Sequence, residues 1–240
     1  MKIIVTKDYE EMSEKAFRII LSVVKENPQA VLGLATGTTP LGLYKKMIAD
    51  HKLNGTSYKQ IKTVNLDEYA GLDINSRQSY VYFMRKNLFD MLDIDLNNTN
   101  IENGKAQNSE AECVRYDKLL DNLQQDLQLL GLGSNGHIAF NEPYTPFGTG
   151  THVVKLAEST IKDNSRLFDR IEDVPADAFT MGPKNIMRAK KILILASGAN
   201  KAQAVYSMVN GEVSEKCPAS ILQLHPDCTL IADKEAAALL

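Results

Sequence analysis

The chain has 240 residues but no tryptophan and only three cysteines. Cys113, Cys217 and Cys228 are far apart in the sequence, and no CxxC motif occurs. Structural zinc sites and redox-active dithiols need closely spaced cysteines, so the cysteine pattern favours neither of them. It favours reduced thiols in a cytoplasmic protein.

Long apolar runs and a strong net charge are also missing. A membrane-spanning helix needs about 20 apolar residues, and no stretch approaches that length. The apolar run at residues 2–5 is followed by Lys7 and Asp8 and is too short for a secretory signal. The formal net charge is −3, with no block of like charges, so the chain has no general attraction to nucleic acid. We therefore predict neither a membrane nor a nucleic-acid partner, but a local positive pocket for a small anion is compatible with this composition.

The sequence instead alternates short apolar runs with amphipathic patterns. Residues 31–34 and 192–195 are apolar on both faces, which is typical of strands that are covered by helices on both sides. No linker rich in proline, glycine or serine divides the chain, and no internal repeat is present. We predict a three-layer α/β fold with a mostly parallel sheet, in a single domain over residues 1–240. Strands are expected at 2–5, 30–35, 62–66, 127–132, 153–156, 191–196 and 228–232.

The clearest helix signal follows the first of these strands. Apolar residues recur at three- and four-residue steps over residues 9–24, after a capping box formed by Asp8 and Glu11. The Asn-Pro pair at 27–28 is expected to end this helix. Further helices are predicted to begin at 39–40, with proline at the first helical position, and to span 76–90, 109–122, 199–209 and 233–240.

Two loops that follow predicted strands have the composition of anion-binding loops. The first consists of Thr36, Gly37, Thr38 and Thr39, directly before a helix. Helix N-terminal N–H groups and threonine hydroxyls favour a phosphate, although an ordinary capped turn would have the same composition. The loop is neither a P-loop nor a GxGxxG motif. The second loop, residues 197–201, ends in Lys201, and Arg166 is a further cationic candidate. Because ligands of open parallel sheets bind beyond the carboxyl ends of the strands, these residues could meet around one phosphate monoester.

Acid–base candidates occupy two other loops of the same kind. Asp67 and Glu68 follow the strand expected at 62–66, and we expect one carboxylate to face the cleft and the other to turn away. The segment 131–143 contains three glycines around His137, with Asn135 and Glu142 nearby. Histidine exchanges protons near neutral pH, and a carboxylate can support its charged form. The spacing does not match an HExxH metal motif, so we predict no metal.

At this point six stretches together resemble the glucosamine-6-phosphate deaminase family. They are LATGTTPLGLY (34–44), VNLDEYAGL (64–72), LGLGSNGHIAFNEP (130–143), NSRLF (164–168), SGANKA (197–202) and PASILQLHPD (218–227). The resemblance covers nearly the whole chain in the order of the family's motifs. It implies a Rossmann-like sheet and the conversion of glucosamine 6-phosphate and water to fructose 6-phosphate and ammonia, in amino-sugar catabolism. It also implies that the reaction needs no metal and no organic cofactor.

The resemblance also implies roles for the candidate residues. Asp67 would take the proton from C2 and deliver it to C1. His137 would move the proton that opens the pyranose ring, supported by Glu142 and Asn135. The 6-phosphate would be held by residues Thr36, Gly37, Thr38, Thr39, Arg166 and Lys201.

Three departures from the family pattern affect these expectations. Asn135 stands where some members have aspartate, so it should orient its neighbours and not carry a proton. Tyr144 stands where glycine is common. The stretch 151–154 lacks the basic residues of the allosteric members, so we expect hyperbolic kinetics and a monomer or weak homo-oligomer.

Two alternatives share the expected fold. A 6-phosphogluconolactonase would bind a sugar phosphate and use a histidine, but it would not need an enolising base at Asp67. A non-catalytic sugar-phosphate sensor would keep the phosphate loop and could lose the acid–base residues, which this chain retains.

Overall fold

The computed structural model describes residues 1–156, 161, 168 and 170–240. In these residues the strands are β1 (Lys2–Thr6), β2 (Val31–Leu34), β3 (Lys62–Asn65), β4 (Asp67–Tyr69), β5 (Thr99–Asn100), β6 (Leu127–Gly131), β7 (His152–Lys155), β8 (Asp177–Thr180), β9 (Ile192–Ala196) and β10 (Cys228–Asp233). The α-helices are α1 (Tyr9–Glu26), α2 (Leu41–Asn54), α3 (Tyr80–Asn87), α4 (Ser109–Asn122), α6 (Pro183–Ile186) and α7 (Ala202–Asn210). The 3-10 segments are η1 (Phe89–Met91), η2 (Leu96–Asn98), η4 (Ile171–Asp173), η5 (Ala199–Lys201) and η6 (Pro218–Leu224).

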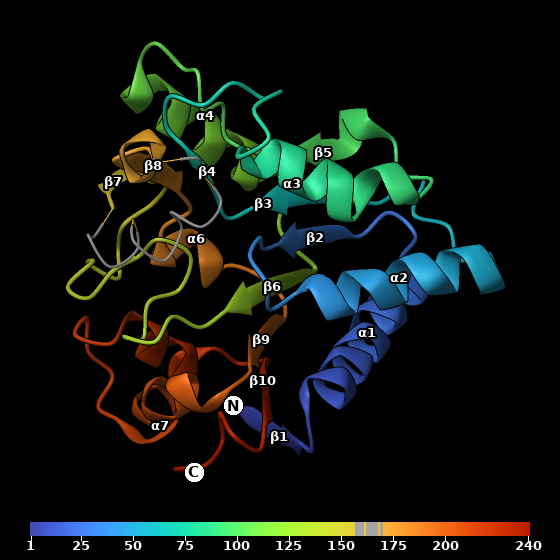
Figure 1. The fold of residues 1–240 in the computed structure, drawn as a ribbon, viewed down its shortest axis with the longest axis vertical. Coiled ribbons are helices and arrows are strands. Elements are labelled where there is room, and N and C mark those ends of the chain that lie inside the picture. Colours follow the sequence, from blue (N-terminus) through green and yellow to red (C-terminus); the bar gives the residue numbers. More distant parts are fainter. Residues whose placement is uncertain (157–160, 162–167, 169) are drawn as a thin grey trace.

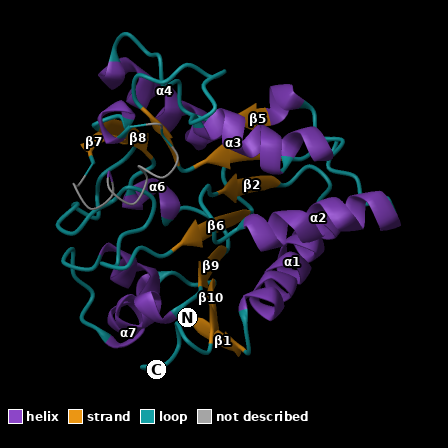
Figure 2. Ribbon diagram, viewed as in Figure 1, coloured by secondary structure: helices purple, strands orange, loops and turns teal. Residues whose placement is uncertain are grey.

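A seven-stranded sheet forms the centre of the described molecule, in the order β1-β10-β9-β6-β2-β3-β5. All neighbouring strands in it run parallel. Helices α1 and α2 lie on one side of the sheet and α6 and α7 on the other (Figures 1 and 2). Every residue of β2 and β9 is buried, which explains why both strands are apolar on both faces. The α/β expectation is confirmed.

A second sheet was not expected from the sequence. It is antiparallel, in the order β4-β8-β7, and it includes the strand expected at 153–156. Strand β4 has only three residues, two of which are acidic, so neither its length nor its polarity indicated a strand. Because β4 follows β3 after a single residue, this small sheet begins where a strand of the main sheet ends.

Two of the long helices agree with their predicted limits, whereas α2 begins at Leu41, with Pro40 as its N-cap and not as its first residue. Helix α4 covers the predicted residues 109–122, and α1 ends at Glu26, directly before Asn27 and Pro28. The side chain of Asp8 accepts a hydrogen bond from the N–H of Glu11 at 2.8 Å, as a capping residue should. The carboxylate of Glu11 accepts from Lys7 and not from Asp8, so the reciprocal half of the predicted capping box is displaced by one residue.

Two helix predictions need correction. The helix expected over 76–90 is shorter, because Ser79 caps α3 by accepting from the N–H of Tyr82 and η1 follows the helix. The alanine-rich segment expected to be helical over 233–240 forms turns after β10. Asp233, where that helix was expected to begin, is instead the last residue of β10 and pairs with Thr6 of β1. Among the described residues, no helix has the length and apolar character that a membrane span requires.

Candidate active site

A cavity of about 270 Å³ lies at the carboxyl ends of the parallel strands. Loops that follow β2, β3, β6 and β9 all contribute to its wall. Its lining residues are Ala35, Thr36, Gly37, Thr38, Thr39, Leu66, Asp67, Tyr80, Gly131, Leu132, Gly133, Ser134, His137, Ala139, Phe140 and Lys201. The structure therefore brings together seven of the ten residues that the sequence predicted for the site. Arg166 lies outside the described residues. Asn135 and Glu142 contact His137 but do not line the cavity.

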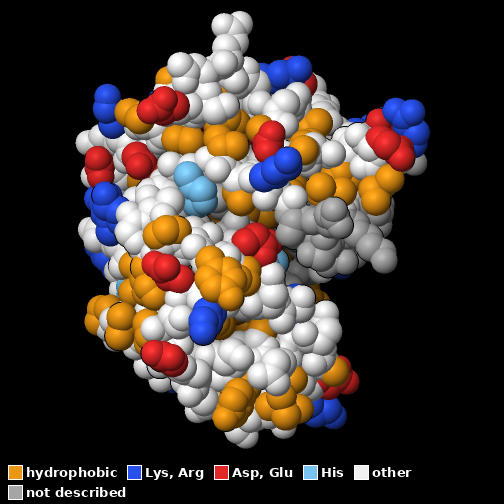
Figure 3. All heavy atoms as spheres, turned by 90° about the vertical axis from the view of Figure 1, so that its left-hand side faces the viewer, with side chains coloured by type: hydrophobic (Ala, Val, Ile, Leu, Met, Phe, Trp, Pro, Cys, Tyr) orange, Lys and Arg blue, Asp and Glu red, His pale blue; other side chains and the backbone are white. Residues whose placement is uncertain are grey.

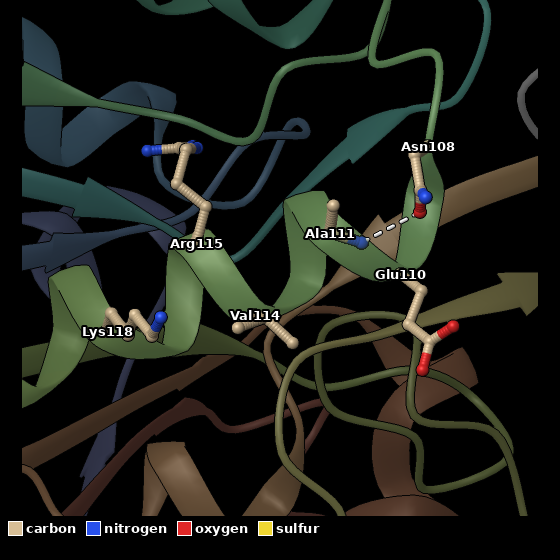
Figure 4. A pocket seen from close by; sticks show the side chains of 6 residues that line it. All are labelled: Asn108, Glu110, Ala111, Val114, Arg115 and Lys118. Atoms are coloured by element: carbon tan, nitrogen blue, oxygen red, sulfur yellow. Dashed lines mark hydrogen bonds between the residues drawn. The ribbon is translucent and has the colours of Figure 1, made fainter.

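Polarity and position, more than size, distinguish this cavity from the others. A larger hollow of about 520 Å³ lies along α4, where Glu110, Val114, Arg115 and Lys118 project from one helix (Figure 4). Its residues come from a single element and its capping residue Asn108. Figure 3 shows the face at the carboxyl ends of β2 and β6, where acidic and basic side chains are interspersed. A preference for an anion must therefore come from particular loops and not from the charge of the whole face.

The first predicted anion loop is firmly braced between β2 and α2. Gly37 has a φ of +89°, a conformation that favours glycine. The Tyr9 hydroxyl accepts from the N–H of Gly42 at 2.8 Å and donates to the carbonyl of Thr39 at 3.0 Å. The Tyr44 hydroxyl donates to the carbonyl of Ala35 at 2.6 Å. These contacts hold the threonine loop in the cavity wall, at the positive end of the dipole of α2.

The second predicted anion loop is used differently from our expectation. The N–H of Gly198 and the hydroxyl of Ser197 both donate to the carboxylate of Asp233, on the neighbouring strand β10. An internal carboxylate thus occupies the donors that a phosphate would need. Lys201, at the end of the same loop, lines the cavity.

Asp67 is the carboxylate that faces the cavity, and only 7% of its surface is exposed. Burial raises the pKa of Asp67 to about 8, and the charge of the adjacent Glu68 adds to the effect. An aspartate with a pKa near neutrality can both accept and release a proton under ordinary conditions. Asp67 is therefore suited to carry a proton between two atoms of one substrate.

Glu68 points away from the cavity, as expected for one member of the pair. Its carboxylate accepts from the N–H groups of Tyr69, Tyr80 and Val81 at 2.8, 2.9 and 3.0 Å. Burial raises the pKa of Glu68 to about 7, while these three hydrogen bonds act in the opposite direction. The three N–H groups that donate to Glu68 favour the ionised form of its carboxylate.

His137 belongs to a short chain of polar contacts with Glu142 and Asn135. The Nδ1 atom of His137 lies 3.4 Å from Oε1 of Glu142, and the other oxygen of Glu142 accepts from the Asn135 amide at 2.7 Å. The side-chain oxygen of Asn135 accepts from the N–H of His137 at 3.2 Å. Asn135 thus orients both partners, which is the role expected for an amide. A Cβ atom at Gly133 would lie 2.4 Å from the imidazole, so glycine is needed for the ring to occupy this place.

Tyr80 and Phe140 line the cavity but were missed in the sequence. The rings are stacked, with centroids 6.2 Å apart, and Tyr69 lies 4.8 Å from Tyr80. Tyr80 was assigned to the interior of a longer helix, whereas it is the first residue of α3. The Ser79 capping signal could have indicated this start, but no local pattern connects it with the cavity.

Tyr144 has a strained backbone and does not line the cavity. Its φ is +74°, and 71% of the residue is exposed. Its N–H donates to the carbonyl of Glu215 at 2.6 Å. In the described part of the chain, no group of three or more histidine, cysteine, aspartate or glutamate residues is arranged to hold a metal ion.

Known proteins are similar to this chain over nearly its whole length. The family model described as glucosamine-6-phosphate isomerases/6-phosphogluconolactonase matches residues 7–231. A glucosamine-6-phosphate deaminase of Clostridium novyi (strain NT) is 52% identical, with both chains fully covered. One of Geobacillus sp. (strain WCH70) is 51% identical, over the whole of this chain and 96% of the relative.

Solved structures extend the comparison. A structure described as a monomeric glucosamine-6-phosphate deaminase has a TM-score of 0.98 and 48% identity, with both chains fully covered. The 6-phosphogluconolactonase of Trypanosoma brucei has a TM-score of 0.80 and 22% identity, over all of this chain and 98% of that one. At such low identity, this second likeness concerns the fold alone.

The buried carboxyl of Asp67 predicts a pH-dependent effect on stability. Between its ordinary pKa of 3.8 and the folded value of about 8, the folded protein holds a proton that the unfolded chain has lost. The stability of the natural protein therefore falls as the pH rises through this window. The Asp67→Asn variant lacks this loss, so its stability relative to the natural protein should rise by a few kcal/mol between about pH 4 and pH 8, at roughly 1.4 kcal/mol per pKa unit.

Urea unfolding at a series of pH values measures this difference. Asp177→Asn, at an exposed position of the same small sheet, is the matched control and should follow the natural protein. A stability difference between Asp67→Asn and the natural protein that does not vary with pH would contradict the prediction.

Proposed function

The chain belongs to the family of glucosamine-6-phosphate isomerases and 6-phosphogluconolactonases, and we propose that it is a glucosamine-6-phosphate deaminase. It converts glucosamine 6-phosphate and water to fructose 6-phosphate and ammonia, with residues 1–240 acting as one catalytic domain. Full-length relatives with about half of their residues identical carry this name. The observation that carries the proposal is that one cavity combines a buried carboxyl, a histidine backed by a carboxylate, and an anion loop.

Ring opening is the first step that the site can perform. The closed sugar opens when a proton leaves the hydroxyl at C1 and a proton reaches the ring oxygen. His137 can exchange both protons, because its imidazole lines the cavity and the Glu142 carboxylate lies 3.4 Å from its Nδ1. The Asn135 amide holds Glu142 in place through a 2.7 Å hydrogen bond.

Isomerisation and loss of ammonia follow from the open chain. The aldehyde at C1 makes the proton at C2 acidic, and Asp67 removes it to form an enolamine. Return of the same proton to C1 leaves an imine at C2. Water adds to that carbon, ammonia departs, and fructose 6-phosphate remains. A base with a pKa of about 8 suits both transfers, since it neither holds nor releases the proton too strongly.

The phosphate is assigned to the threonine loop and to Lys201. Thr36, Gly37, Thr38 and Thr39 offer hydroxyl and N–H groups at the start of α2, and Lys201 reaches the same cavity from the loop after β9. Arg166 is proposed from its motif as a further phosphate ligand, although it lies outside the described residues. A phosphate held at this end leaves the reacting end of the sugar free to reach Asp67 and His137.

The lactonase alternative fits the cavity less well. Hydrolysis of a lactone requires water to attack a carbonyl and needs no base that removes a proton from carbon. The buried carboxyl of Asp67 would have no role in that reaction. The lactonase structures resemble this chain at only 14–22% identity, whereas the deaminases reach about 50% over the full length.

Joint release of ammonia and fructose 6-phosphate tests the proposal. Purified protein should release the two in equal amounts from glucosamine 6-phosphate, with and without a chelator, since the reaction depends on acid–base side chains. The same protein with 6-phosphogluconolactone is the control substrate. Lactone hydrolysis without ammonia release would favour the alternative.

Single substitutions separate the roles of Asp67 and His137. Asp67→Asn should lower kcat by about 10²–10⁴-fold and abolish exchange of the C2 proton with solvent, while substrate still binds. His137→Gln should slow turnover of the closed ring more than turnover of an open-chain analogue. Persistent C2 exchange in Asp67→Asn would exclude Asp67 as the base. Equal losses on both substrates would exclude ring opening as the role of His137.

We also propose a cytoplasmic monomer, or a weak homo-oligomer, without allosteric activation. The similar solved deaminase is described as monomeric, and Cys113, Cys217 and Cys228 are free thiols. The substrate curve should be hyperbolic, and N-acetylglucosamine 6-phosphate should not change its shape. Light scattering and steady-state kinetics at several protein concentrations measure both properties. A sigmoidal curve that the acetylated sugar makes hyperbolic would contradict this proposal.

A further inference from the structure

Glu68 is a buried carboxylate that the proposed reaction does not use. Only 2% of its surface is exposed, and it does not line the cavity. Two of its three hydrogen bonds come from Tyr80 and Val81, which are the first two residues of α3 and lie 12 and 13 positions further along the chain. A carboxylate at this place binds N–H groups that a helix cannot satisfy itself and meets the positive end of its dipole. Glu68 thus joins the start of α3 to β4.

The start of α3 in turn forms part of the cavity wall. Tyr80 lines the cavity beside Asp67, and its ring is stacked against that of Phe140. Tyr80 also interacts with the side chain of Thr36, in the phosphate loop, and its ring centroid lies 4.8 Å from that of Tyr69. A shift of the first turn of α3 would therefore move one wall of the cavity and disturb the loop on the other side.

We propose that Glu68 is a positioning residue for the reaction. It anchors the first turn of α3 to β4, so that Tyr80 keeps its place in the cavity wall. It also holds a negative charge beside Asp67. The proposal rests on the proposed function in so far as Asp67 is the base. Neither effect requires Glu68 to touch the substrate. The two effects are separable, because one depends on the length of the side chain and the other on its charge.

The charge around Asp67 comes from several elements. Glu68 lies next to it on β4, and Glu102 follows β5. Tyr80 on α3 and Tyr116 on α4 also interact with Asp67, and they are neutral near pH 7 because burial holds the pKa of both hydroxyls well above the usual range. His137 and Lys201 line the same cavity.

Glu68 is the member of this group that can supply a negative charge. Burial holds the pKa of Glu102 well above its usual range, and no hydrogen bond reaches either of its carboxyl oxygens in the described structure. The charged form of Glu102 is therefore disfavoured. Three N–H donors favour the charged form of Glu68, and a like charge beside Asp67 makes Asp67 a stronger base.

Two substitutions of Glu68 separate charge from length. Glu68→Gln keeps the length and one acceptor oxygen, but it removes the charge and the acceptor for one set of N–H donors. The rise of kcat/KM with pH that reports Asp67 should therefore move to lower pH by about half a unit or more, and kcat should fall by up to about tenfold. Glu68→Asp keeps the charge but is too short to reach Tyr80 and Val81. It should raise KM several-fold and leave the pH profile nearly in place.

Glu112→Gln is the matched control. Glu112 is also buried and accepts a backbone N–H, that of Asn103, at 2.7 Å, but it contacts neither α3 nor the cavity. This variant should lose thermal stability without a change in the pH profile. If Glu68→Gln behaves in the same way, Glu68 is only structural and the proposal is overturned. If Glu68→Gln does not fold, a KM for Glu68→Asp equal to that of the natural protein overturns the positioning role.

A titration that does not depend on turnover distinguishes this inference from the proposed function. The carboxyl carbon of Asp67 can be followed by NMR in protein with labelled aspartate, and its signal is identified by its absence in Asp67→Asn. A lower midpoint in Glu68→Gln than in the natural protein supports the electrostatic role, even if no ammonia is released from glucosamine 6-phosphate. An unchanged midpoint overturns that role, even if the deaminase activity is present.

Discussion

The active site depends on the parallel pairing of β2, β3, β6 and β9. Because neighbouring strands point the same way, the loops that follow them emerge at one edge of the sheet. The threonine loop, Asp67, His137 and Lys201 come from four such loops, separated by up to 165 positions along the chain. No local preference of these residues would bring them together without the sheet.

Burial of carboxyl groups beside one another is the second constraint. Asp67 becomes a base near neutral pH because it is removed from water and has a charged neighbour. The same burial would destabilise Glu68, but the first turn of α3 supplies the hydrogen bonds that offset the cost. The reactivity of one carboxylate is thus linked to the anchoring of a helix by the next residue. This linkage gives each of the two adjacent acids in β4 its own role: the side chain of Asp67 faces the cavity, and that of Glu68 faces the start of α3.

Much of the site was predictable because its signals are local. A glycine among threonines before a helix indicates an anion loop, and a histidine among glycines after a strand indicates a reactive position. Gly37 and His137, the residues that these two signals concern, both line the cavity. The loop at 197–201 shows the limit of such reasoning. Its composition resembles an anion loop, but Asp233, 35 positions beyond Gly198, occupies its donors. Likewise, Tyr80 lines the cavity from the start of α3, where its N–H donates to Glu68, 12 positions earlier in the chain.

By itself, the sequence determined the α/β fold class, seven of the ten strands in the described residues, and the limits of α1 and α4. These properties follow from apolar periodicity, capping residues and short motifs, which act over a few positions. Only the tertiary structure decided the strand order, the small antiparallel sheet, and which carboxylate faces the cavity. It also decided that residues 233–240 are not a helix. Those outcomes depend on hydrogen bonds and packing between segments that are distant in the chain. The free energy of such contacts cannot be predicted from the sequence of any one segment.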